Sequence, residues 1–148
     1  MSHEVTIYGA IFGSPGPTSS VYWLYVKNRE ALGYLPARDS WPPLERTFCT
    51  IPMNAGKPGF DRTQMIHFGL SFKNFEDGWP IWLAKFESLL RELYWTQVRL
   101  HLESELHGSF DYRWDATAGA LEGCWGSPPV PVKDWEFSGG PREFGEPD

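Results

Sequence analysis

The sequence has few of the features that mark secreted, membrane-spanning or thiol-dependent proteins. It holds only two cysteines among 148 residues, Cys49 and Cys124, and they form no Cys-x-x-Cys motif. No apolar run approaches the roughly 20 residues that a membrane-spanning helix needs. No basic segment typical of a secretory signal follows Met1. We therefore expect a soluble, cytoplasmic protein with reduced thiols.

Signatures of the common enzyme classes are also missing. The segment 13–17 is rich in glycine, but its prolines lack backbone donors and no Lys-Ser/Thr pair follows, so it is not a phosphate-binding loop. Rossmann, kinase and zinc-ribbon patterns are absent. Cys49 with His67 or His101 as its base would need strands to bring them together, and no Gly-x-Cys-x-Gly elbow supports this pair. Cys49 is better explained as a small buried hydrophobic residue.

Basic residues are scarce in the second half of the chain. Residues 1–75 hold seven Lys and Arg against five Asp and Glu, whereas 76–122 hold four against nine and 123–148 hold two against five. This sign disfavours nucleic-acid binding, which neutralises phosphates with Lys and Arg. It suits a basic protein partner, although solubility is the simpler explanation of charge alone.

Aromatic residues, in contrast, are abundant. They make up 16% of the chain and include eight tryptophans, and 41% of all residues are hydrophobic, which is ample for the core of one domain. Tryptophan is rarely buried completely and is enriched at interface hot spots. We therefore consider Trp79 and Trp125 as exposed anchors for a partner.

The region 79–115 gives the clearest structural pattern. Apolar residues recur at helical spacing from Trp82 to Leu93 and predict an amphipathic helix over about 79–94, with Pro80 tolerated in its first turn. The run 96–106 then alternates, which predicts a strand that buries Val98, Leu100, Leu102 and Leu106. A second strand follows at 110–114, with Phe110, Tyr112 and Trp114 on one face.

Other segments complete an α+β prediction. Strands are expected at 5–12, 47–51 and 63–72, the last two as an antiparallel hairpin around a loop at 53–61, and 33–46 is expected to be a loop. Residues 18–30 are compatible with a helix that Thr18, Ser19 or Ser20 caps, and equally with a strand. The fold class is therefore α+β, a mainly antiparallel sheet with one long helix packed on one face.

The domain organisation follows from the composition. We expect a core domain over 1–115 and a Gly/Pro-rich extension over 116–148. The extension would dock on the core through Trp135 and Phe137 and fray after Gly139.

The polar side of the alternating run is the candidate working surface. It presents Arg99, His101, Glu103, Glu105 and His107, with Asp111, Arg113 and Asp115 as neighbours on the next strand. Zinc accepts such His and carboxylate ligands, but same-face residues lie about 6.6 Å apart along a strand, too far for most of them to share one ion. Nearby carboxylate pairs such as Glu103 with Glu105 arise freely in an acidic protein. We therefore expect a binding face, with no metal, cofactor or catalytic residue.

One family resembles part of this chain. The resemblance covers about residues 60–115 and rests on 66–69 (IHFG), 79–83 (WPIWL), 86–95 (FESLLRELYW), Glu103 and 112–114 (YRW). These segments resemble small immunity proteins encoded beside bacterial polymorphic toxins of contact-dependent or type VI secretion systems. The resemblance implies a non-catalytic cytoplasmic inhibitor that occludes one cognate toxin domain, and it carries over no catalytic residues. A general interaction module of a secretion apparatus and a small metal-dependent hydrolase remain the alternatives.

Overall fold

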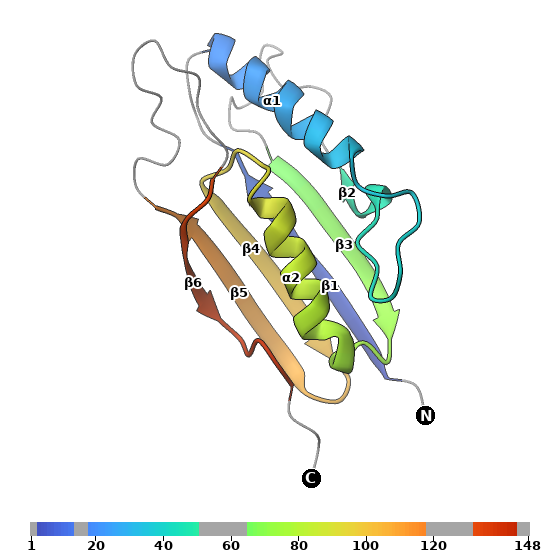
Figure 1. Ribbon diagram of the computed structural model, residues 1–148. Helices are drawn as coiled ribbons and strands as arrows, with labels where there is room; N and C mark the ends of the chain where they lie inside the picture. The colour runs from blue at the N-terminus through green and yellow to red at the C-terminus, as the bar shows by residue number, and fades with distance from the viewer. Residues whose placement is uncertain (1–2, 14–17, 51–64, 118–131, 145–148) are drawn as a thin grey trace.

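The protein forms one six-stranded sheet, seen in a computed structural model that describes residues 3–13, 18–50, 65–117 and 132–144, with the backbone alone over 18–25. All neighbouring strands are antiparallel, in the order β2-β3-β1-β4-β5-β6 (Figure 1). The strands are β1 (Glu4–Phe12), β2 (Cys49–Thr50), β3 (Met65–Lys73), β4 (Gln97–Ser104), β5 (Gly108–Ala116) and β6 (Trp135–Gly139). With the helices α1 (Thr18–Gly33) and α2 (Trp79–Leu90), this confirms a mainly antiparallel α+β fold.

Helix α2 crosses one face of the sheet, over β1 and β4 (Figure 1). Its apolar stripe is buried as the sequence predicts, with Trp82 and Phe86 fully covered. The Phe86 ring lies 5.5 Å from the ring of Trp114 on β5 and 5.2 Å from that of Phe68 on β3. Aromatic rings at these separations add to the free energy gained by burial. The core therefore lies between α2 and this inner face of the sheet.

The prediction of a single long helix over 79–94 is wrong in two respects. Helix α2 ends at Leu90, whose carbonyl accepts the backbone N–H of Leu93 at 3.3 Å and the indole N–H of Trp95 at 2.8 Å in the turn that follows. Leu93 and Trp95 still reach the core, but from the turn that follows the helix. Helix α1, which is longer than α2, is the second helix that the residue pattern at 18–30 left open.

The alternation in β4 is confirmed for its first three inward residues. Val98, Leu100 and Leu102 are buried, while Arg99 and Glu103 are exposed. The strand ends at Ser104, whose hydroxyl accepts hydrogen bonds from two backbone N–H groups of the following turn. Leu106 therefore lies in the turn and is 39% exposed, which corrects its predicted burial.

The hairpin between 47–51 and 63–72 is confirmed in a shorter form. Of the described residues in 47–51, Cys49 and Thr50 pair with β3, and Arg46–Phe48 forms a 3₁₀ turn. The expected loop at 53–61 lies outside the described residues, as do Cys124 and Trp125.

The C-terminal segment contributes more than an aromatic contact. Trp135 and Phe137 belong to β6, which hydrogen-bonds along β5 as the sixth strand. Ordered contacts continue past Gly139, where fraying was expected, because Arg142 binds Glu87 of α2 and the Phe144 ring lies 5.5 Å from that of Phe110. The C-terminal segment thus holds helix α2 and strand β5.

Candidate binding face of the sheet

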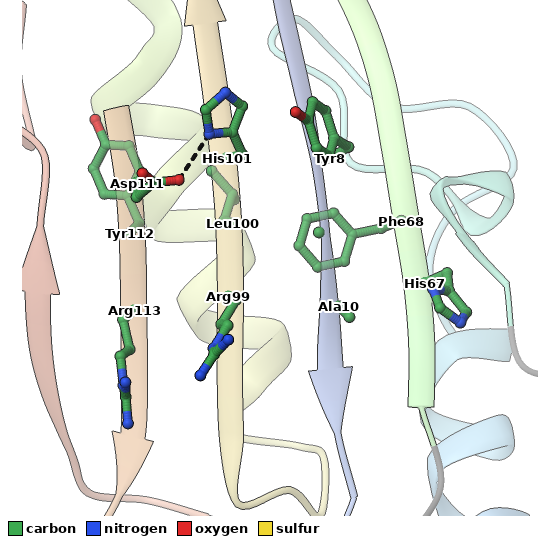
Figure 2. A pocket seen from close by; sticks show the side chains of 11 residues that line it. Tyr8, Ala10, His67, Phe68, Arg99, Leu100, His101, Asp111, Tyr112 and Arg113 are labelled. Atoms are coloured by element: carbon green, nitrogen blue, oxygen red, sulfur yellow. Dashed lines mark hydrogen bonds and ion pairs between the residues drawn. The ribbon is translucent and has the colours of Figure 1, made fainter. Parts of the chain in front are cut away.

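The face of the sheet opposite α2 carries the polar side chains, and we call it the outer face. Figure 2 views it with α2 behind the sheet. Inner and outer side chains alternate along each strand, as period-two geometry requires. In the four inner strands β3, β1, β4 and β5, the outer face comprises Glu4, Thr6, Tyr8, Ala10, Phe12, Met65, His67, Gly69, Ser71, Lys73, Gln97, Arg99, His101, Glu103, Ser109, Asp111, Arg113 and Asp115.

Tyr8, His101 and Asp111 form one row across three strands. The register places Tyr8 opposite His101 and His101 opposite Asp111. The two rings lie 5.0 Å apart, and His101 Nδ1 lies 2.7 Å from Asp111 Oδ1 (Figure 2). His101 Nε2 lies 3.1 Å from Glu103 Oε1. The hydrogen bond with Asp111, and then that with Glu103, raise the pKa of His101 above 6.5, although burial opposes the charge.

The next row is basic. Ala10 lies opposite Arg99, and Arg99 lies opposite Arg113 on β5. Side chains opposite each other on antiparallel strands are about 5 Å apart at their Cβ atoms, and like charges there destabilise a sheet. Asp115 balances this charge in part, because it accepts a hydrogen bond from Arg113 Nε at 2.7 Å, and this bond lowers the pKa of its carboxyl. Arg99 makes no hydrogen bond or salt bridge within the described residues.

A hollow of about 680 Å³ lies between these two rows and β3. Tyr8, His67, Arg99, His101, Asp111 and Arg113 surround it, and the small side chain of Ala10 lies between Arg99 and His67 (Figure 2). Beneath it, Gly9 leaves room on the inner face for the ring of Phe68, whose Cζ would lie only 2.8 Å from a Cβ at that position. Small residues on β1 thus lower the surface where the flanking strands carry long side chains.

A second hollow, of about 480 Å³, lies at the other end of the same strands. Its lining is acidic: Glu4, Thr6, Glu103, Ser104, Glu105 and Ser109. Glu105 is held there because its carboxylate accepts the backbone N–H of Glu4 at 3.1 Å. The outer face is therefore divided, with arginines toward the start of β4 and carboxylates toward its end.

The structure brings together six of the ten residues that the sequence pointed to. Arg99, His101, Glu103, Asp111, Arg113 and Asp115 share the outer face. Glu105 and His107 lie in the turn after β4, and the His107 ring stacks on Phe144 at 4.7 Å. Trp79 is 0% exposed and belongs to the core, so its expected role as an exposed anchor is wrong. Trp125 lies outside the described residues.

Tyr8 and His67 also border the hollow, although neither was predicted as a residue of the binding face. Both occupy alternate positions in strands that were predicted, so the period-two pattern contained the signal. In β1 that pattern is interrupted by Gly9, which takes an inner position without an apolar side chain. Trp41, 57% exposed, is the exposed tryptophan of the described residues instead of Trp79.

The catalytic arrangements considered from the sequence are not assembled. Cys49 lies opposite the inward Phe68, whereas the neighbouring His67 is on the outer face, so the sheet separates the two side chains. Burial raises the pKa of the Cys49 thiol to about 12, which disfavours the thiolate that a nucleophile requires. Among the described residues, no group of three His, Cys, Asp or Glu is arranged to hold a metal ion.

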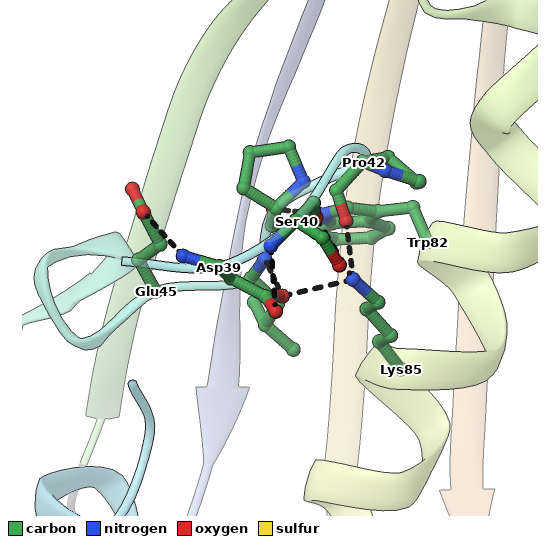
Figure 3. A network of polar contacts seen from close by, with 8 residues as sticks. Asp39, Ser40, Pro42, Glu45, Trp82 and Lys85 are labelled. Atoms are coloured by element: carbon green, nitrogen blue, oxygen red, sulfur yellow. Dashed lines mark hydrogen bonds and ion pairs between the residues drawn. The ribbon is translucent and has the colours of Figure 1, made fainter. Parts of the chain in front are cut away.

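A second polar cluster lies on the α2 side, and its groups bond one another and the neighbouring backbone. Lys85 of α2 donates to Asp39 at 2.9 Å and to the carbonyls of Ser40 and Pro42 (Figure 3). The backbone N–H of Leu44, followed by Lys85, lowers the pKa of the Asp39 carboxyl. Together these bonds fasten the loop 36–45 to the helix, so we assign this cluster to stability.

Comparison with known protein families, with curated proteins and with solved structures finds no match for this chain. Within the described residues, neither helix combines the length and the apolar character that crossing a bilayer requires.

Proposed function

We propose that this protein is a non-catalytic cytoplasmic immunity protein that binds and occludes one secreted toxin domain, and that the outer face of the sheet makes the contact. The observation that carries the proposal is that exposed polar side chains on that face are held in place by contacts with one another. Tyr8, His101 and Asp111 are exposed or partly exposed, yet ring contact and hydrogen bonds already fix them relative to one another. A face that is ordered before binding loses less entropy when a partner docks.

The mixture of side chains supports binding to a protein. Aromatic residues and arginine are enriched at interface hot spots, and the outer face combines Tyr8 with Arg99 and Arg113. Charges of both signs, divided between two ends, restrict the orientation in which a partner fits. The resemblance of 60–115 to immunity proteins and the separation of Cys49 from His67 agree with this class.

Co-expression with the toxin domain encoded by the adjacent gene tests the proposal. We expect the wild-type chain to restore growth and to co-purify with the toxin. Glu103→Lys reverses an exposed charge on the outer face and should weaken the complex, whereas Glu92→Lys, an exposed position beyond the end of α2, should not. Circular dichroism and thermal melting of both variants establish that they are folded.

The outcomes separate the class of function from the location of the site. A wild-type chain that neither restores growth nor binds the toxin contradicts the proposed function. Equal binding by Glu103→Lys and by the wild type, in a complex that forms, moves the contact away from the acidic end of the outer face.

A further inference from the structure

The arginine pair at the hollow has more positive charge than its surroundings balance. Arg99 and Arg113 are directly opposite each other, and Asp111 and Asp115 lie two residues to either side of Arg113; Asp115 is the one bound to it. That carboxylate already accepts hydrogen bonds from Arg113 Nε at 2.7 Å and from Gln97 Nε2 at 3.0 Å. Asp111, on the other side of the hollow, is bound to His101. One carboxylate therefore serves two guanidinium groups.

The donors of this pair are available to a ligand. The bond to Asp115 uses Nε of Arg113, so its two terminal nitrogens make no hydrogen bond with the described residues. Figure 2 shows the side chains of Arg99 and Arg113 running in the same direction along adjacent strands, away from His101. Each guanidinium group presents N–H donors in the planar fork that a carboxylate accepts.

The rest of the hollow favours an apolar group beside the anion. Its lining also includes Ala10, Phe68 and Leu100, and the exposed ring of Tyr8 borders the hollow. A free inorganic anion would leave this carbon surface in water, whereas an acid attached to an apolar body covers it.

We propose that the hollow is a carboxylate-binding pocket, in which Arg99 and Arg113 hold the acid and Tyr8 and Ala10 cover an attached apolar group. In the toxin complex its occupant is an Asp or Glu side chain of the toxin. This second statement rests on the proposed function, whereas the pocket itself does not. The partner surface is then acidic where it meets the start of β4, whereas the net charge of this chain suited a basic partner.

The pocket is tested first on the chain alone. Benzoate serves as the probe and benzyl alcohol as the neutral control, both titrated at constant ionic strength and followed by amide chemical shifts. We expect saturable shifts at Tyr8, Ala10 and Arg99 with benzoate only. Arg99→Gln should abolish them, and Arg38→Gln, at an exposed arginine of the loop on the α2 side, should leave them unchanged. Absence of saturable shifts in the wild type overturns the pocket, whether or not a toxin binds.

The occupant is tested in the complex. Arg99→Gln should weaken toxin binding by about 10- to 100-fold, the loss expected when a charged hydrogen bond is removed. Arg99 makes no hydrogen bond or salt bridge within the described residues, and it faces another arginine. The melting temperature of the Arg99→Gln variant should therefore equal or exceed that of the wild type. Wild-type affinity in Arg99→Gln overturns the assigned occupant, while loss of folding would be seen as a lowered melting temperature. Restored binding between Arg99→Glu and a toxin with one acid changed to Lys would identify that acid.

Discussion

Arg142 and Glu87 form a bidentate ion pair that joins the C-terminal segment to helix α2. Arg142 Nη1 donates to Glu87 Oε1 at 2.8 Å and Nη2 donates to Oε2 at 2.9 Å. The indole of Trp114 also donates to Oε2, at 3.0 Å. Helix α2, strand β5 and the segment after β6 thus meet at one nearly buried carboxylate, and this connection keeps the inner side of the sheet closed while the outer face stays free.

Removal of the arginine should therefore destabilise the fold. Arg142→Ala leaves Glu87 largely covered with its Trp114 bond alone, and we expect a loss of about 1–3 kcal/mol in the free energy of unfolding. Urea denaturation measures the change, and Glu143→Ala at the exposed neighbouring position is the matched control. Equal midpoints for the two variants would show that the pair contributes nothing.

The same carboxylate predicts an acid dependence of stability. Burial opposes its charge, but the bonds from Arg142 and Trp114 outweigh burial and hold the pKa of Glu87 below 4.5. A depressed folded pKa stabilises the protein fully above the unfolded value of 4.5, and this contribution is lost as pH falls through the lower folded value. Glu87→Gln should reduce the slope of stability against pH in this range. An unchanged slope would assign acid sensitivity to other groups.

Gly9 should tolerate no side chain. A Cβ there would collide with the backbone oxygen of Arg99 and approach Phe68 Cζ to 2.8 Å. We expect Gly9→Ala to cost about 1–3 kcal/mol or more, the range for overpacking a core. Gly33→Ala, at the end of α1 with nothing within 4 Å, should be neutral or stabilising by up to about 1 kcal/mol. Thermal melting of both variants measures the difference. Similar decreases in melting temperature for the two would contradict the close approach of β1, β3 and β4.

His101 should titrate above pH 6.5, because the protonated ring gains most from the hydrogen bond to Asp111. NMR titration of its ring protons measures the pKa directly. Asp111→Asn should lower that pKa more than Glu103→Gln does, since Asp111 has the larger effect. A raised folded pKa stabilises the protein fully below pH 6.5, and the contribution is lost as pH rises through the folded value. An unchanged His101 pKa in Asp111→Asn would mean that the hydrogen bond between His101 and Asp111 does not form in solution.

Cys49 should react slowly with alkylating reagents. Burial raises the pKa of its thiol from 9.0 to about 12, so the native chain holds very little thiolate at pH 8. In a Cys124→Ser background, iodoacetamide should modify Cys49 at least about tenfold faster in urea than in buffer. Equal alkylation rates in urea and in buffer would show that the Cys49 thiol is exposed to solvent in the folded protein.

Strong local patterns predicted much of the fold. Alternation located β4, paired aromatics located β5, and the apolar stripe located the start of α2 at Trp79. The end of α2 at Leu90 was not predicted, because the turn that follows is held by the Leu93 N–H and by the Trp95 indole, a side-chain contact that spacing does not reveal. Strand β6 was missed as a strand because five residues in a Gly/Pro-rich segment carry little pattern of their own. Hydrogen bonds to β5 stabilise this segment as a strand, although its own residues do not predict one.

The candidate site was predicted in part for a related reason. Residues on one strand, such as Arg99 and His101, are grouped by spacing alone. Tyr8 and His67 come from strands far away in the sequence, and only the order β3-β1-β4-β5 brings them to the same hollow. Residue type alone could not show whether Trp79 is exposed, and its ring packs against that of Trp82 in the core.

The contact surface itself can be measured by hydroxyl-radical footprinting of the toxin complex. Tyr8 on the outer face is 47% exposed and Tyr34 after α1 is 85% exposed, so both react in the free protein. Protection of Tyr8 with unchanged oxidation of Tyr34 is the result expected if the toxin covers the outer face. Continued oxidation of Tyr8 in a saturated complex would contradict it.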